Sequence, residues 1–313
     1  MDAPRFVDSI CRMRPNLADA YPLHAVLAEL RDARFSQGLA CPRCGGRRIQ
    51  RWGSFAGRHR YRCRDCERTF SDLTGTPAAY SKKLALWAPY SVCMRGGMSV
   101  RASAGWVGIH PSTAFRWRHR VLDSLRGRDA ESLVGWTELG TMRFAYSEKG
   151  RRNAATAPRC RGASRGTRAS QRRIVVLVGC DRVGDVVTAV LGEATGRRPT
   201  GLDLDRALAG RLLQPAILTS MHGRFSSYSM FAVRQGAPYR DARIAQRQRR
   251  DALAHVRSLL GYCERFIDWM DRFRGVATRY LANYLAWHRV LDRESRNRFN
   301  VIALRWPLGD AYG

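Results

Sequence analysis

The stretch LVGWTELGT, residues 133–141, places one acidic residue, Glu138, in a neutral and mostly apolar run that has the character of a strand. The chain around it has 313 residues and a formal net charge of +29, so a lone acid in a buried-looking strand is unexpected. Three interpretations of Glu138 are open: a member of an active site, the remnant of one, or a strand-end residue that faces solvent.

The segments after this strand predict a mixed sheet. Two β-branched runs in residues 172–193 predict a hairpin that turns through DRVG. Residues 201–213 predict a helix, and PAILTS, residues 215–220, a short buried strand. The order β, β-hairpin, α, β is similar to the start of a ribonuclease-H-like sheet. Residues 240–273 and 275–296 then predict two long helices.

Four cysteines upstream have the spacing of a metal site. They read C-x2-C, eighteen residues, C-x2-C, and each Cys-x-x-Cys turn can present two thiolates to one ion. We interpret residues 39–76 as a zinc ribbon; the alternative is a set of structural or redox cysteines. The predicted zinc ligands are Cys41, Cys44, Cys63 and Cys66.

A helical region follows the cysteines. Residues 22–34 and 81–97 each predict one helix, and residues 98–126 predict a helix, a turn near Gly108 and a second helix opened by Pro111. In that second helix we expect Phe115 to face the core. The pattern is typical of a helix-turn-helix; the alternative is an ordinary helical hairpin whose arginines are only solvated. Donors for phosphates or base edges would be Ser112, Thr113, Arg116, Arg118 and Arg120.

The charge balance favours a polyanionic partner. The chain has 55 Lys and Arg against 26 Asp and Glu, and like charges repel in a compact fold unless a polyanion neutralises them. Double-stranded DNA is the expected partner, with a ribosomal-type or heparin-like basic protein as the alternative. Residues 149–173 hold nine basic residues and no acid, so this loop, with Arg151 and Arg152, either settles on phosphates or is a solvated insertion.

The polar start of the chain and the lack of a long apolar run predict neither a secretion signal nor a membrane span. Nine cysteines in such a chain are expected to be reduced or metal-bound, in a cytoplasmic and nucleoid-associated protein.

Three segments together resemble a known family: RYRCRDCERTFSDLTGTP, the pair MSV and HPSTAFRWRHRVL, and GVATRYLANYLAWHRVL. The family is the insertion sequence fifteen-ninety-five group of bacterial transposases, and the resemblance spans about residues 20–292. It implies a zinc ribbon, a helix-turn-helix and a ribonuclease-H-like DDE domain that holds two divalent metal ions with carboxylates. The chemistry is in-line phosphoryl transfer on DNA, for which Mg²⁺ prefers anionic oxygen ligands.

The resemblance also marks departures from the family pattern. Thr137 stands in the place of the family's first aspartate, and Glu138 matches the glutamate that follows it. Ser220, or Met221 with a shift of one residue, stands in place of the second aspartate. A late helix of the family carries an asparagine, a histidine and a lysine, and here the three positions hold Leu260, Cys263 and Ile267.

These departures remove metal-competent groups, so Glu138 is interpreted as the remnant of a lost site. We expect a multidomain α+β protein that binds DNA and is catalytically inactive, with structural zinc, and with Mg²⁺ only if catalysis is retained. One alternative is an active metal-dependent transposase or nuclease that uses displaced acids. Another is an assembly role, as a homo-oligomer or with an active transposase. The displaced acids would be Asp181, Asp185, Asp203, Asp205, Glu264 and Asp268.

The expected domains are a helical segment (1–38), the zinc ribbon (39–76), the helix-turn-helix (80–128), a ribonuclease-H-like domain (131–292) and a tail (293–313).

Overall fold

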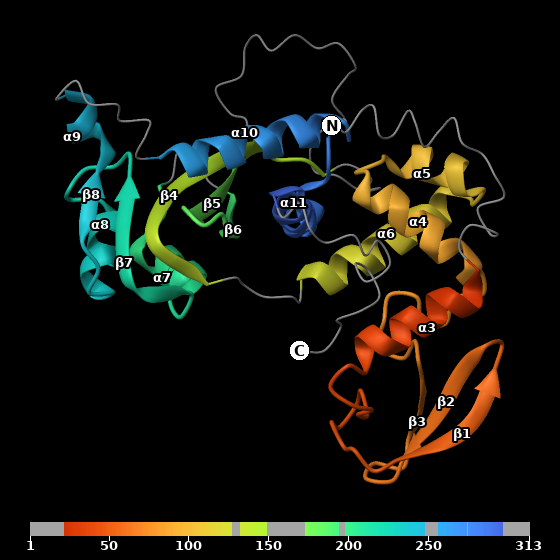
Figure 1. The fold of residues 1–313 in the computed structure, drawn as a ribbon. Coiled ribbons are helices and arrows are strands. Elements are labelled where there is room, and N and C mark those ends of the chain that lie inside the picture. The colour runs from red at the N-terminus through yellow and green to blue at the C-terminus, as the bar shows by residue number, and fades with distance from the viewer. Residues whose placement is uncertain are drawn as a thin grey trace. The chain divides into compact units, whose positions relative to one another are not determined.

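The computed structural model describes residues 22–126, 132–148, 173–193, 198–247, 256–273 and 275–296 (Figure 1). These residues form two compact units: the first holds the described residues up to 126, and the second those from 132 on. Within the described ranges, no helix is both long and apolar enough to cross a membrane.

The first unit begins with a helix and a small antiparallel sheet, which surrounds a core of Cys41, Tyr61, Cys63 and Phe70. A buried carboxylate joins helix and sheet, because Asp72 accepts from Arg31 at 3.0 Å and from the Tyr61 hydroxyl at 3.0 Å. The elements, with the strands in their sheet order, are α3 (Leu23–Arg34), β1 (Ile49–Phe55), β2 (Arg58–Cys63) and β3 (Thr69–Ser71).

The described part of this unit continues with four helical elements: η1 (Leu84–Leu86), α4 (Trp87–Arg95), α5 (Val100–Val107) and α6 (Pro111–Arg126). The α5–α6 pair matches the predicted two helices, and Gly108, with φ of 75°, supplies the left-handed residue that ends α5. The helix expected over 81–97 begins only at Trp87, which stacks on Trp117 at 4.5 Å. Phe115 was expected in the core and is 40% exposed; Trp117 packs there instead.

The second unit is built on a mixed sheet in the order β6-β5-β4-β7-β8. The first three strands pair antiparallel, and β7 and β8 continue parallel to β4. This is the ribonuclease-H-like topology that the strand order predicted. The strands are β4 (Leu133–Ala145), β5 (Arg173–Asp181), β6 (Val186–Glu193), β7 (Leu212–Ser220) and β8 (Tyr239–Asp241).

Helices cover both faces of this sheet, as Figure 1 shows for α10 and α7 on opposite sides of β4. One face packs Leu139, Leu177 and Leu218 against Tyr228 and Phe231. On the other face a Cβ at Gly140 would lie 2.7 Å from Leu259, so α10 approaches β4 closely. The helices are α7 (Gly201–Leu208), α8 (Ser227–Arg234), α9 (Ala242–Arg247), α10 (Arg257–Asp271), η3 (Thr278–Tyr280) and α11 (Leu281–Arg296).

The late part of the chain differs most from the sequence expectations. The helix expected over 201–213 ends at Leu208, because β7 begins at Leu212 rather than at residue 215. Helix α8 and strand β8 were not expected at all. Residues 240–273 do not form one helix, since β8 and α9 precede α10, and residues 248–255 lie outside the described ranges.

Candidate functional site

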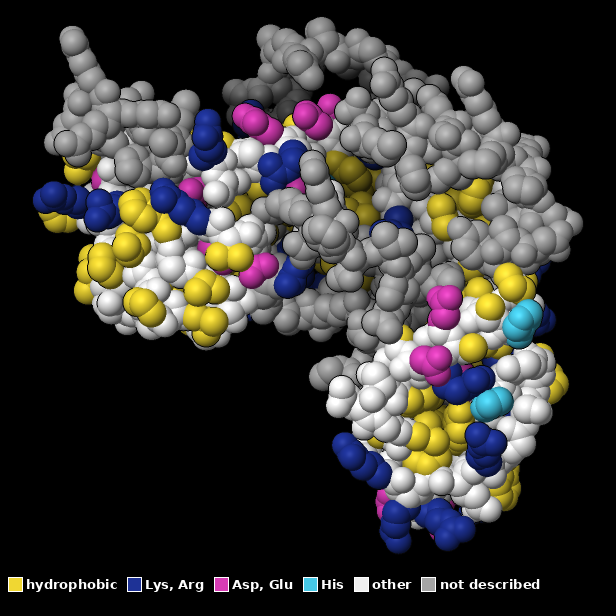
Figure 2. Space-filling view, in the orientation of Figure 1, with side chains coloured by type: hydrophobic (Ala, Val, Ile, Leu, Met, Phe, Trp, Pro, Cys, Tyr) yellow, Lys and Arg dark blue, Asp and Glu magenta, His cyan; other side chains and the backbone are white. Residues whose placement is uncertain are grey.

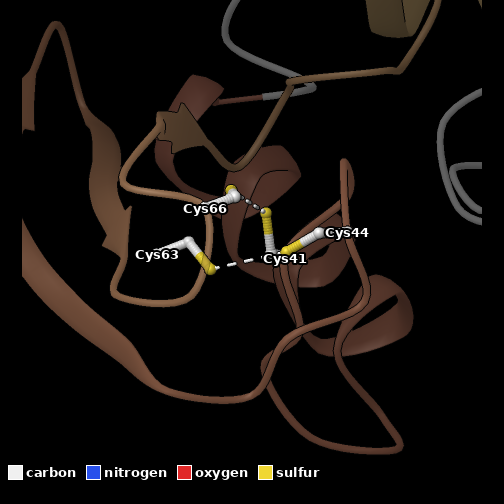
Figure 3. Close-up of side chains that lie close together, drawn as sticks. All are labelled: Cys41, Cys44, Cys63 and Cys66. Carbon is white, nitrogen blue, oxygen red and sulfur yellow. Dashed lines mark hydrogen bonds between the residues drawn. The ribbon is translucent and has the colours of Figure 1, made fainter.

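Four cysteines come together on two short loops of the first unit (Figure 3). Cys41 and Cys44 precede β1, and Cys63 and Cys66 lie where β2 ends. Backbone hydrogen bonds close both loops: the Gly45 N–H donates to the Cys41 carbonyl at 2.9 Å, and the Cys63 N–H to the Arg68 carbonyl at 3.0 Å.

The sulfur positions fit a tetrahedral metal ion. All four lie within 4.8 Å of one another, and the Sγ–Sγ distances Cys41–Cys66 and Cys44–Cys63 are both 3.7 Å. A zinc ion with zinc–sulfur bonds of about 2.3 Å requires sulfur–sulfur distances of about 3.8 Å. Among the described residues this is the one cluster of three or more His, Cys, Asp or Glu side chains that could hold a metal ion.

The thiols differ in how readily they ionise. Burial raises the pKa of Cys41, but the backbone N–H groups of Arg43 and Cys44 and the neighbouring thiols lower it to a net value of about 7. At Cys44 the Gly46 N–H lowers the pKa, whereas the neighbouring thiols, chiefly Cys66, raise it to about 12. Neighbouring thiolates repel one another, and a bound cation offsets that repulsion, so metal binding would release protons.

The sheet of the second unit gives Glu138 a structural partner. Glu138 is 1% exposed, and its Oε2 accepts a hydrogen bond of 2.8 Å from the backbone N–H of Leu259, in the first turn of α10. Burial raises the pKa of Glu138; the Leu259 N–H, the charge of Arg182 and the Ser258 N–H oppose that shift. The carboxylate therefore caps a helix whose N-terminus carries partial positive charge.

Strand register places Ser220 one position beyond the residue that pairs with Glu138, so the two side chains point to opposite faces of the sheet. Glu138 pairs with Thr219, and Leu139 with Ser220, across β4 and β7. The Ser220 hydroxyl lies 2.6 Å from the Tyr239 hydroxyl and accepts from the His222 N–H at 3.1 Å. These hydroxyls and amides form an internal hydrogen-bond network at the end of β7.

The remaining positions on α10 point outward or stay uncharged. Leu260 is 38% exposed and Ile267 47% exposed. Cys263 is partly buried, and burial together with the nearby Glu264 raises the pKa of its thiol to about 11.

Three of the six candidate displaced acids have defined local tasks. Asp181, fully buried, accepts from the backbone N–H groups of Gly184 at 2.7 Å, Asp185 at 2.8 Å and Val134 at 3.0 Å. Asp203 forms a capping box with Thr200 at the start of α7. Asp205 pairs with Arg234 at 2.9 Å.

The other three candidate acids are Asp185, beside Asp181, and Glu264 and Asp268, on α10. Asp185 follows the β5–β6 turn and is partly buried, and Glu264 and Asp268 are exposed on α10. Of the described residues, no three of these acids converge on one point that could hold a metal ion.

The predicted DNA-contacting residues of α6 divide into two groups. Ser112, Thr113 and Arg116 lie on its first turns, with Ser112 and Arg116 exposed. Arg118 is fully buried and donates to the Met98 carbonyl at 2.5 Å, so the expectation that it contacts DNA is wrong: it fixes the loop before α5. Arg120 is exposed and donates to the Ala79 carbonyl at 3.2 Å. Arg151 and Arg152 lie outside the described residues.

A cationic cluster on the Glu138 side of the sheet was not anticipated from the sequence. The guanidinium carbons of Arg182 and Arg240 lie 4.0 Å and 5.2 Å from the centre of the Trp136 ring. Trp136 and Glu138 are two positions apart on β4, so their side chains point to the same face of the sheet. Arg240 belongs to β8, a strand that was not predicted from the sequence. No sequence pattern therefore indicated that Arg240 lies near Trp136 and Arg182.

Replacement of Cys63 tests the metal centre. We expect the purified chain to hold one zinc ion and Cys63→Ser to weaken zinc binding by more than about tenfold, because a tetrahedral site loses a thiolate. Competition with a chromophoric chelator measures the affinity. Cys263→Ser, in the second unit, is the control and should keep normal zinc content. Equal zinc affinity in both variants would contradict the assignment.

Paired substitutions test the role of Glu138. Glu138→Ala leaves the Leu259 N–H without its acceptor, so we expect the free energy of unfolding to fall by about 1–3 kcal/mol. Glu138→Gln keeps an acceptor oxygen and should cost less. Chemical denaturation of the full chain, followed by circular dichroism, provides the comparison. A larger loss for the glutamine variant than for alanine would exclude the capping role.

The raised pKa of Glu138 determines whether its contribution to folding stability rises or falls with pH. The ordinary pKa of a glutamate carboxyl is 4.5, and below that pH Glu138 is protonated in both the folded and the unfolded chain. The stability advantage of the wild-type chain over Glu138→Gln should therefore be greatest there. That advantage should shrink as pH rises through the raised folded-state pKa. Denaturation curves of the two chains between pH 4 and pH 8 measure it; a growing wild-type advantage would be the opposite result.

Comparison with known proteins yields a related sequence and distantly similar structures. No known protein-family model matches the chain. A Halobacterium salinarum protein described as "Uncharacterized protein in transposable element ISH50" is 33% identical over 175 residues. That match covers 51% of this chain and 58% of the relative, so the chain spans little more than half of the relative's length.

A chain of the "Crystal structure of a pre-cleavage Mos1 transpososome" aligns over 63% of this chain and 72% of its own length, with 10% identity. Its TM-score is 0.24, too low to support an argument about fold or function. Over about half its length, then, the chain resembles a protein encoded in a transposable element.

Proposed function

We propose that this protein is a transposase-related protein that binds double-stranded DNA and does not carry out metal-dependent strand cleavage. The relation to a protein of a transposable element and the ribonuclease-H-like sheet support the first part. The net charge of +29 supports a nucleic-acid partner.

The observation that carries the proposal is the hydrogen bond from the Leu259 N–H to Glu138. Two-metal phosphoryl transfer needs several carboxylates that converge with free oxygen atoms. Here one oxygen of Glu138 accepts a hydrogen bond from α10. Its paired residue on β7 is Thr219, and the residue before it on β4 is Thr137, so both neighbours offer only hydroxyl groups. Hydroxyl groups cannot by themselves hold two divalent ions.

DNA binding is assigned to the first unit. The exposed Ser112 and Arg116 lie at the start of α6, where backbone N–H groups and the helix dipole favour a phosphate. We place α5 and α6 as a helix-turn-helix next to a zinc ribbon, and zinc as a structural ion. Arg118 is left out of the contact surface because it is buried.

The wider setting follows from these assignments. We propose that the domains divide as the sequence pattern indicates and that the protein acts on the nucleoid in the cytoplasm. A homo-oligomer or a complex with an active transposase would bring two such DNA-binding units to paired DNA ends.

A cleavage assay tests the proposal. Zinc-loaded protein is incubated with a labelled duplex that carries the ends of its own genomic neighbourhood, in Mg²⁺, in Mn²⁺ and in EDTA. We expect sequence-preferring binding in all three conditions and no nicking. Metal-dependent nicking would establish the alternative, an active transposase that uses displaced carboxylates.

Arg116→Ala tests the assignment of α6. Removal of one phosphate contact should weaken duplex binding and reduce the slope of log K against log salt by about 1. Fluorescence anisotropy over a salt series measures the slope. The control is Arg206→Ala, an exposed arginine on α7, which should leave the slope unchanged. Equal slopes for wild type and Arg116→Ala would remove α6 from the interface.

A further inference from the structure

The outer face of the ribbon sheet carries arginines at every second position. Along β2 and the residue that follows it, RHRYRCR, the side chains of Tyr61 and Cys63 point into the core and are 3% and 0% exposed. Because side chains alternate along a strand, the four arginines at the other alternate positions share the opposite face. They are Arg58, Arg60, Arg62 and Arg64.

A bulge in β1 brings two aromatic rings to the same face. Arg51 pairs with Tyr61, and Ser54 pairs with His59. Two residues of β1, Trp52 and Gly53, therefore lie opposite one residue of β2, Arg60. Gly53, with φ of 88°, absorbs the extra residue. Without the bulge, Trp52 and Phe55 would point to opposite faces, since they are three positions apart.

Contacts show that the rings and the arginines share this surface. The guanidinium carbon of Arg62 lies 5.1 Å from the centre of the Trp52 ring, and that of Arg58 lies 5.5 Å from the centre of Phe55. Trp52 is nevertheless 44% exposed and Phe55 67% exposed. Single exposed rings are common on protein surfaces, but two rings on one face, each beside an arginine, form a patch of the kind that marks an interaction site.

The charge of this region selects the kind of partner. Residues 33–64 contain no Asp or Glu, and the first acid after them, Asp65, is paired with Arg48 at 2.5 Å. Figure 2 shows Lys and Arg side chains projecting at several points from this part of the molecule. A face of this sign would repel a basic partner, including a second copy of the same face, and attract a polyanion.

We propose that this ribbon face, Trp52 and Phe55 with Arg58, Arg60, Arg62 and Arg64, binds an unpaired DNA strand. The arginines would contact successive phosphates, and the two rings would stack on bases. Stacking requires an open base plane, which a paired duplex hides inside the helix, so the face distinguishes unpaired from paired DNA. The inference rests on the proposed DNA-binding function and adds a second DNA form to it.

The test uses the full-length, zinc-loaded chain with two labelled probes, an oligothymidylate strand and a blunt duplex of equal length. For the double variant Trp52→Ala/Phe55→Ala we expect binding to the single strand to weaken by about tenfold or more, with duplex binding little changed. Phe225→Ala removes a fully exposed ring from the second unit and should affect neither probe. Unchanged zinc content shows that the double variant is folded.

A second variant tests the geometry rather than the rings. Gly53→Val strains the left-handed residue of the bulge and should misdirect Trp52, so single-strand binding should fall while both aromatic residues remain. Trp52→Phe keeps a ring at the site and should retain most of the single-strand affinity.

The possible failures are distinguishable. If the unmodified chain binds neither probe, the proposed function itself is wrong. If it binds the duplex but not the single strand, only the present inference is wrong. Equal losses on both probes in the double variant would mean an ordinary duplex contact. No loss on either probe would leave the face to another partner, such as a protein, and would also overturn the inference.

Discussion

The hydrogen bond between Glu138 and the first turn of α10 is the interaction on which the second unit depends. A carboxylate that is 1% exposed loses its hydration, and a helix N-terminus is one of the few places in a fold that can compensate it. The contact joins residues 121 positions apart in the chain. The hydrogen bond therefore fixes α10 against β4. It also gives a structural role to the acid that a metal site would need.

Buried acids of the two units are stabilised by side-chain cations and by backbone N–H groups. In the first, a buried Asp72 joins α3 to the ribbon through Arg31, and four cysteines converge on one point. In the second, Arg265 pairs with the buried Asp292, whereas Asp181 and Glu138 accept from backbone N–H groups. A carboxylate that accepts from backbone donors is held in one orientation and has fewer lone pairs left for a metal ion. We therefore interpret Asp181 and Glu138 as structural residues rather than as metal ligands.

Much of the fold could be predicted from local patterns. The Cys-x-x-Cys spacing identified the four sulfur atoms that come together. The neutral, mostly apolar run at 133–141 identified β4, and the two β-branched runs identified β5 and β6. Strand β8 has three residues and α8 has eight, so neither carries enough periodicity to be recognised. The role of Glu138 could not be predicted, because its partner is a backbone N–H on a distant helix. Arg118 was misassigned because a sequence does not show which arginine of α6 points inward.

Manganese binding measures the central claim most directly, because the claim concerns whether Glu138 is free to coordinate a metal ion. Electron paramagnetic resonance of Mn²⁺ titrated into the zinc-loaded chain, with Glu138→Gln beside it, separates the two roles. The capping role predicts no stoichiometric Mn²⁺ site in either chain. A tight Mn²⁺ site in the wild type that disappears in Glu138→Gln would contradict it and would identify Glu138 as a metal ligand.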